Sequence, residues 1–175
     1  HFRMVDPDYF DIYTVAAEFN APVYIHTGPS PFINTNTDAP YTDPAYLETA
    51  IIENPDTTFI LGHLGYDFIN KNHLHLETCI NLAQTYPNVW LEPSALGSSG
   101  SDPNGTNLTE AMAAIKEADL INKTIYGSDG PQRPGFAKDY AERTLLSMEN
   151  AGYSFDEAQL VMSGNSEQLF LREEP

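Results

Sequence analysis

Basic residues are scarce in this chain. Of its 175 residues, 8 are Lys or Arg and 25 are Asp or Glu, which gives a formal net charge of −17. A polyanion of this kind does not bind nucleic acid through its phosphates, and it gains nothing from an anionic membrane surface. We therefore expect neither partner. The charge does not exclude an anionic substrate, because a bound metal can reverse the potential inside a pocket.

Cysteine is also nearly absent. The single Cys79 excludes an intrachain disulfide and a thiolate metal cluster, and its apolar helical surroundings predict a buried core residue. No apolar run reaches transmembrane length, and no signal peptide or lipidation motif is visible. The first residue is His1 rather than methionine, so upstream signals would not be seen. We expect a piece of a longer polypeptide; the compartment stays open, with the cytoplasm favoured.

Four short apolar runs each finish on a polar or charged residue. They read PVYIHTG, TTFILGHLG, NVWLEPSA and KTIYGSDGP, and they end on His26, His63, Glu92 and Asp129. Short continuous apolar runs are typical of strands buried on both faces of a parallel sheet, whose carboxyl ends carry the chemistry of α/β proteins. Two histidines and an aspartate at such ends predict a metal site. The alternative is ordinary strand-end residues bonded to nearby backbone.

Helical patterns alternate with these runs, at about 6–20, 43–54, 70–86, 107–119, 137–151 and 154–171. Asp6-Pro7 and Asp43-Pro44 are helix starts, and capping boxes are predicted at Asn107-x-x-Glu110 and Ser154-x-x-Glu157. A break is expected at 163–165. The long polar loop 28–42 follows His26 directly and is expected to form a wall or lid over the site.

Strict alternation predicts an α/β fold, one domain over 1–175, with a parallel sheet and right-handed crossovers. Two architectures remain open: a doubly wound sheet, or half of a (β/α)₈ barrel. No Gly-x-Gly-x-x-Gly loop follows a strand, so a dinucleotide-binding fold is unsupported. A complete barrel needs about 250 residues. The pair His73-Leu-His75 is expected on an exposed helix, where residues i and i+2 share no face and cannot hold one metal.

The five motifs PVYIHTG, FILGHLG, NVWLEPSA, IYGSDGP and MSGNSEQLF, in this order, resemble the C-terminal half of the amidohydrolase-2 type of metal-dependent hydrolase. That group includes aminocarboxymuconate-semialdehyde decarboxylase and related decarboxylases, lactonases and hydratases. The resemblance covers nearly the whole chain. It implies strands 5–8 of a TIM barrel, with strands 1–4 and their His-x-His pair absent, and with residues 1–3 as the end of strand 4.

The resemblance also implies roles for three residues. His26 would bind the metal, and Asp129 would bind the metal and shuttle protons. His63 would be catalytic, activating the metal-bound water or the substrate as in decarboxylase-like members; in other members this histidine also binds metal. Glu92 stands where many members have aspartate, and Gly164-Asn165 would serve packing. The cofactor would be a divalent metal, zinc first and manganese second, with no other cofactor site.

The implied function is that of a metal-dependent hydrolase acting on a small carboxylate, lactone or amide-like substrate through a metal-activated water. Decarboxylation or hydration is the alternative within the family. The alternative of another class is a non-catalytic half-barrel with a binding or structural role.

Four strands cannot close a barrel. We therefore expect that the chain alone exposes an apolar inner face. In the whole protein this face would be covered by the missing half, by a second chain or in a homo-oligomer. Its expected residues are Val23, Ile25, Phe59, Leu61, Val89, Leu91, Ile125 and Gly127. Alone, the chain is expected to bind metal poorly and to show no turnover.

Overall fold

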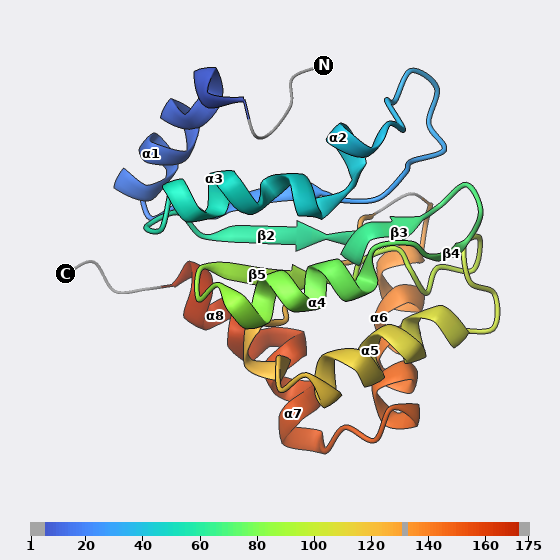
Figure 1. Ribbon diagram of the computed structural model, residues 1–175. Helices are drawn as coiled ribbons and strands as arrows, with labels where there is room; N and C mark the ends of the chain where they lie inside the picture. Colours follow the sequence, from blue (N-terminus) through green and yellow to red (C-terminus); the bar gives the residue numbers. More distant parts are fainter. Residues whose placement is uncertain (1–5, 131–132, 172–175) are drawn as a thin grey trace. The chain divides into compact units, whose positions relative to one another are not determined.

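A computed structural model describes residues 6–130 and 133–171 (Figure 1). The chain forms two compact units, His1–Leu91 and Glu92–Pro175, and each is described by itself. The expected end of a preceding strand, at residues 1–3, lies outside the described residues. The expectation of one domain over the whole chain stays a prediction.

The first unit alternates helices and strands as the sequence predicts. Its elements are η1 (Pro7–Tyr9), α1 (Phe10–Glu18), β1 (Val23–His26), α2 (Ala39–Thr42), η2 (Pro44–Leu47), α3 (Glu48–Glu53), β2 (Phe59–Gly62), η3 (His63–Gly65), β3 (Tyr66–Asp67), β4 (Asn72–His73), α4 (Leu76–Thr85) and β5 (Val89–Glu92), whose last residue opens the second unit. Both Asp-Pro starts are confirmed, because Asp6 accepts a hydrogen bond from the Asp8 N–H and Asp43 accepts one from Ala45.

The strands form a sheet in the order β1-β2-β5. β1 and β2 are parallel, with Val23 beside Phe59 and His26 beside Gly62. Beyond β2, the Phe59 N–H donates to the Asn88 carbonyl, 2.8 Å away. The predicted α/β class with a parallel sheet is confirmed.

The prediction that the apolar inner face of this sheet is exposed is wrong. Ile25, Phe59, Leu61, Val89 and Leu91 are buried, not exposed. On β1 the exposed side chains are the other set, Tyr24 and His26, so this strand is not covered on both faces. Successive side chains of a strand point to opposite faces. On β1, Ile25 packs into the core while Tyr24 and His26 face outward. Every residue of β2 and β5 is buried, so the predicted burial on both faces is confirmed for these two strands.

The helix predicted from residue 70 begins at Leu76 instead. An antiparallel hairpin takes its first residues, with β3 paired to β4. The Asp67 carboxylate accepts hydrogen bonds from the backbone N–H groups of Ile69 and Asn70 and from the Asn70 side chain. An aspartate that accepts hydrogen bonds from the backbone N–H groups two and three residues later in the chain stabilises a turn in place of a helix.

The second unit is helical. It contains α5 (Thr106–Glu117), η4 (Ile121–Lys123), α6 (Phe136–Asn150), α7 (Phe155–Gln159), a π-helical turn η5 (Leu160–Gly164) and α8 (Asn165–Phe170) (Figure 1). The strand predicted at 123–128 is reduced to an isolated bridge at Thr124. Here the Tyr126 N–H donates to the Val161 carbonyl of the distant π turn instead of to a neighbouring strand.

The capping box predicted at Ser154 is confirmed, and the one predicted at Asn107 is wrong. The Ser154 hydroxyl and the Glu157 side chain cap each other's backbone at the start of α7. At α5 the N-cap is Gly105, and the buried Asp102 carboxylate accepts from the N–H groups of Thr106 and Leu108. The break expected at 163–165 is a continuous π turn.

The burial predicted for Cys79 is confirmed. Cys79 is fully buried, and burial raises its thiol pKa to about 12. None of the described helices combines the length and the apolarity that a membrane-crossing helix requires.

Candidate active site

His26 and His63 lie side by side at the carboxyl ends of β1 and β2. The parallel register places His26 beside Gly62, the residue before His63. The two imidazole centroids are 4.5 Å apart, with the rings inclined at 61°. His63 is buried and His26 is exposed. These two predicted site residues are therefore brought together by the sheet register.

The His26 ring is oriented by the loop that follows it. Its Nε2 lies 3.1 Å from the Gly28 carbonyl oxygen. A carbonyl can only accept, so Nε2 carries the proton and Nδ1 has the lone pair in the neutral ring. A histidine whose second nitrogen donates to a backbone carbonyl is the arrangement in which proteins hold metal-ligating imidazoles.

The His63 ring is enclosed by aromatic side chains. Tyr24 crosses over Gly62 to bring its hydroxyl within 3.5 Å of His63 Nε2. A Cβ on Gly62 would overlap the Tyr24 ring, so this crossing requires glycine. Phe68 packs edge-on to His63, with centroids 5.4 Å apart. Sequence reasoning missed Tyr24, although its place two residues before His26 on a strand indicates the same face.

A left-handed turn carries His63. Three successive residues have positive φ: His63 at 64°, Leu64 at 50° and Gly65 at 65°. Left-handed backbone costs a non-glycine residue about 1–3 kcal/mol and persists only where surrounding structure enforces it, often at functional sites. Gly65 also lies against the His75 backbone, where no Cβ fits. The sequence signal was Gly65, two residues after the predicted catalytic histidine.

The two carboxylates predicted at strand ends belong to the second unit. Asp129 is exposed and has a φ of 55°. Glu92 is buried, with its Oε2 accepting from the Ser94 hydroxyl at 2.6 Å and its carboxylate against Gly127. Burial raises the pKa of Tyr126, and the negative charge of Glu92 raises it further.

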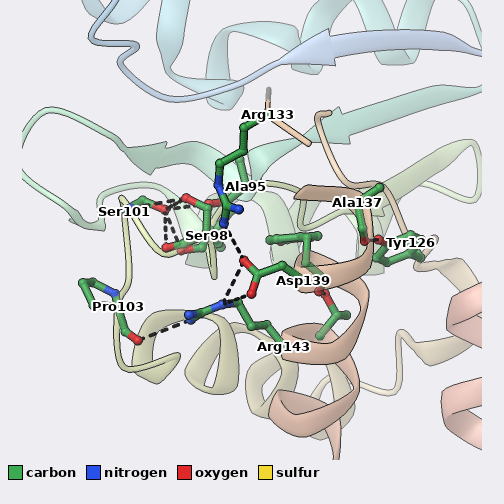
Figure 2. A network of polar contacts seen from close by, with 12 residues as sticks. Ala95, Ser98, Ser101, Pro103, Tyr126, Arg133, Ala137, Asp139 and Arg143 are labelled. Carbon is green, nitrogen blue, oxygen red and sulfur yellow. Dashed lines mark hydrogen bonds and ion pairs between the residues drawn. The ribbon is translucent and has the colours of Figure 1, made fainter. Parts of the chain in front are cut away.

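A polar network in the second unit includes residues of α6 and of the segments that follow Glu92 and Asp129 in the chain (Figure 2). Arg133, just after the Asp129 loop, pairs with Asp139 of α6 at 3.0 Å. Arg143, one helical turn later, also pairs with Asp139 and donates to the Pro103 carbonyl at 3.3 Å. Within the second unit, Pro103 and Arg133 thus both contact side chains of α6.

The donor set fits a divalent metal in kind, because imidazole and carboxylate are the ligands that zinc and manganese accept. Within the described residues, however, no group of three or more His, Cys, Asp or Glu side chains is arranged to hold an ion. His26 and His63 form one pair in the first unit, while Asp129 belongs to the second. Convergence of Asp129 on the histidine pair stays a prediction.

The prediction that His73 and His75 lie on a helix is wrong. His73 ends β4, and its ring packs edge-on to Tyr66. His75 is the N-cap of α4, with its Nδ1 3.6 Å from the Asp43 carboxylate. The exclusion of both from metal binding stays a prediction.

The sequence model of a family described as Amidohydrolase matches residues 2–172. Curated proteins gave no match. Among solved structures, an uncharacterised TIM-barrel protein from Bordetella bronchiseptica is 21% identical, with 97% of this chain and 52% of that chain covered and a TM-score of 0.69.

Two further structures are similar at this level. The "Putative 2-Pyrone-4,6-Dicarboxylic Acid Hydrolase" from Pseudomonas putida is 14% identical, with 100% of this chain and 60% of that chain covered and a TM-score of 0.67. A dihydroxybenzoic acid decarboxylase from Polaromonas sp. JS666, with bound manganese and the inhibitor 2-nitroresorcinol, is 17% identical, with 99% and 57% covered and a TM-score of 0.60. The chain therefore has the fold of part of a TIM barrel and spans little more than half the length of these structures.

Proposed function

This chain belongs to the amidohydrolase family, and on that premise we propose that it carries part of the active site of a metal-dependent hydrolase or decarboxylase. The observation that supports the proposal is the His26–His63 pair, whose rings meet at the ends of two adjacent parallel strands. Carboxyl ends of barrel strands are where enzymes of this fold place catalytic groups.

We assign metal binding to His26 and Asp129. His26 is exposed, and the Gly28 carbonyl, 3.1 Å from its Nε2, orients the imidazole ring. Asp129 is an exposed carboxylate and supplies the oxygen donor. When bound, the divalent metal supplies Lewis acidity, which lowers the pKa of water and polarises a carbonyl or carboxylate. Zinc and manganese both suit these donors.

His63 is the proposed catalytic acid and base. An imidazole changes protonation near neutral pH and exchanges protons with a group within hydrogen-bond reach. Its buried ring is kept from bulk water by Tyr24 and Phe68, and its Nε2 faces the Tyr24 hydroxyl. Asp129 would then pass a proton to the leaving group, as an exposed carboxylate beside the reacting atoms can.

The proposed substrate is a small carboxylate, lactone or amide-like molecule. Hydrolysis is the first reaction class, supported by the family and by the pyrone hydrolase name among the similar structures. Decarboxylation of an aromatic acid is the second, supported by the similar dihydroxybenzoic acid decarboxylase. Both need a metal, an acid–base group and a pocket that accepts a carboxylate. We propose that a second polypeptide segment completes this pocket.

Manganese titration followed by NMR tests the metal site. Because Mn²⁺ broadens the signals of nearby nuclei, we expect the side-chain signals of His26 and Asp129 to disappear first, with His63 next. Zn²⁺ competition should restore them. The substitutions His26→Ala and Asp129→Ala should each weaken Mn²⁺ binding at least about 10-fold, because even the loss of a group that only supports a metal ligand costs about 10- to 100-fold.

His73→Ala is the matched control, since it removes an imidazole from the same unit at a site that we exclude. It should leave Mn²⁺ affinity unchanged. Selective broadening of His73 or His75 would overturn the assignment. So would signals of Asp129 that stay sharp while those of His26 broaden, because the two would then not share an ion.

A further inference from the structure

The hydroxyl of Thr27 lies beneath the turn that carries His63. Thr27 is fully buried. Its Oγ1 donates a hydrogen bond to the Gly62 carbonyl at 2.7 Å and accepts one from the Gly65 N–H at 2.7 Å. One side chain thus joins the residue just before His63 to the residue two positions after it. We call this pair of bonds the Thr27 bridge.

The turn needs such support because its backbone is unfavourable. His63, Leu64 and Gly65 all have positive φ, and inside the turn the Tyr66 N–H donates to the His63 carbonyl. A left-handed conformation at His63 and Leu64 persists only where outside contacts enforce it. The bridge provides two such contacts, and they lie one residue before the turn begins and on its last residue.

The chemistry of the bridge requires a hydroxyl. A hydroxyl is the side-chain group that donates and accepts through one small atom. Valine has nearly the shape of threonine but neither function. Its introduction would take the buried acceptor away from the Gly65 N–H. The Gly62 carbonyl would lose the hydroxyl but keep the Thr27 backbone N–H, 3.1 Å away. Serine keeps both functions and lacks only the methyl group. These two residues therefore separate hydrogen bonding from packing.

We propose that Thr27 is a positioning residue that fixes the His63 imidazole against His26. The inference deepens the proposed function and rests on it, because the placement matters to the reaction through the assigned role of His63. Thr27 follows His26 directly in the chain, so β1 ends on the proposed metal ligand and the next residue supplies the group that holds the neighbouring histidine. The spacing between the two rings is then set by two consecutive residues at the end of β1.

The test compares Thr27→Val with Thr27→Ser in the metal-free 175-residue chain by NMR. In the unsubstituted chain, nuclear Overhauser contacts should join the His26 and His63 rings, whose centroids are 4.5 Å apart. Thr27→Val should weaken these contacts at least 2-fold and shift the His63 imidazole nitrogen resonances. Thr27→Ser should restore both signals.

Cys79→Ala is the control for packing, because Cys79 Sγ lies 4.0 Å from Thr27 Oγ1 and the substitution opens space beside it without removing the bridge. It should lower the melting temperature and leave the ring contacts unchanged. If Thr27→Val folds and retains the wild-type ring contacts, or if Cys79→Ala alters them equally, the positioning role is refuted.

A measurement on the unsubstituted chain covers the case in which Thr27→Val fails to fold. The Gly65 amide should exchange with solvent on the order of 100-fold more slowly than an unprotected amide. The Thr27 hydroxyl proton should be observable with contacts to the Gly65 amide proton. Exchange of Gly65 at the unprotected rate would refute the bridge. All these measurements are free of metal, so a failed metal assignment is distinguishable from a failed bridge.

Discussion

The two site histidines differ although they are neighbours. His26 is exposed and bonded to a backbone carbonyl, whereas His63 is buried and surrounded by aromatic rings. The difference follows from position: His26 is the last residue of β1 on its outward face, and His63 begins a turn that folds back over the sheet end. An exposed imidazole suits a metal ligand, and an enclosed one suits proton transfer in a water-poor place.

We predict that protonation of Glu157 lowers the stability of the second unit in acid. A hydrogen bond from Lys116 Nζ at 2.7 Å lowers the pKa of this carboxyl from 4.5 to about 2, with help from the Ser154 N–H. A carboxyl with a lower pKa in the folded state stabilises the fold at pH above its unfolded pKa and loses this effect as pH falls to the folded value. The contribution should therefore disappear between about pH 4.5 and pH 2.

Glu157→Gln measures this contribution by chemical unfolding at several pH values. The free energy of unfolding should fall less steeply between pH 4.5 and pH 2 in this variant than in the unsubstituted chain. Glu149→Gln makes the same charge change on the exposed face of α6 and should retain the full slope. Equal slopes in all three chains would contradict the pairing.

Helix α5 shows how a buried residue replaces a sequence signal. The capping box at Asn107 fits the pattern, yet Asp102, four residues before the helix, accepts from the N–H groups of Thr106 and Leu108. A carboxylate that is already buried in the preceding loop can satisfy two N-terminal N–H groups and interact with the helix dipole. The cap is thus supplied by the loop that follows Glu92.

Asp102→Ala should reduce the free energy of unfolding by about 1–3 kcal/mol, because it removes a cap and leaves buried N–H groups without it. Thermal and urea unfolding measure the effect. Asp102→Asn keeps one acceptor oxygen, so its free energy of unfolding should lie between those of the unsubstituted chain and Asp102→Ala. Asn104→Ala, an exposed change in the same loop, should stay within about 0.5 kcal/mol of the unsubstituted chain. A loss for Asn104→Ala as large as that for Asp102→Ala would contradict the assigned cap.

On the scale of the molecule, this chain covers 52% to 60% of three similar TIM-barrel structures. Among the described residues the sheet order leaves β1 at one edge, and its outward side chains include Tyr24, which is 48% exposed. An edge strand with exposed aromatic surface favours association with another chain or segment. The exposed site face and the sheet edge thus coincide at β1.

We predict that the isolated 175-residue chain associates, binds metal weakly and shows no turnover. Sedimentation should show mass that rises with concentration, and Mn²⁺ or Zn²⁺ should be lost on dialysis. Assays for hydrolysis of 2-pyrone-4,6-dicarboxylate and decarboxylation of 2,6-dihydroxybenzoate should give no product. A stable monomer that retains metal and is active would contradict the proposal that a further segment completes the site.

The sequence by itself determined the class of fold and the pairing of the two histidines. Apolar runs that end on His26 and His63 predicted two strands, and parallel register places their ends together whatever the details of packing. It also determined the Asp6 and Asp43 starts and the Ser154 box, since each depends on contacts within a few residues. Local patterns predict local bonds well.

Only the tertiary structure decided which face of β1 is covered, where the helix after His63 begins and what caps α5. Each depends on contacts between segments distant in sequence or on competition between two local patterns. Alternating strand residues define two faces without saying which one is packed. The left-handed turn at His63 likewise depends on Thr27, 38 residues before Gly65, because an unfavourable backbone conformation exists only where distant groups hold it.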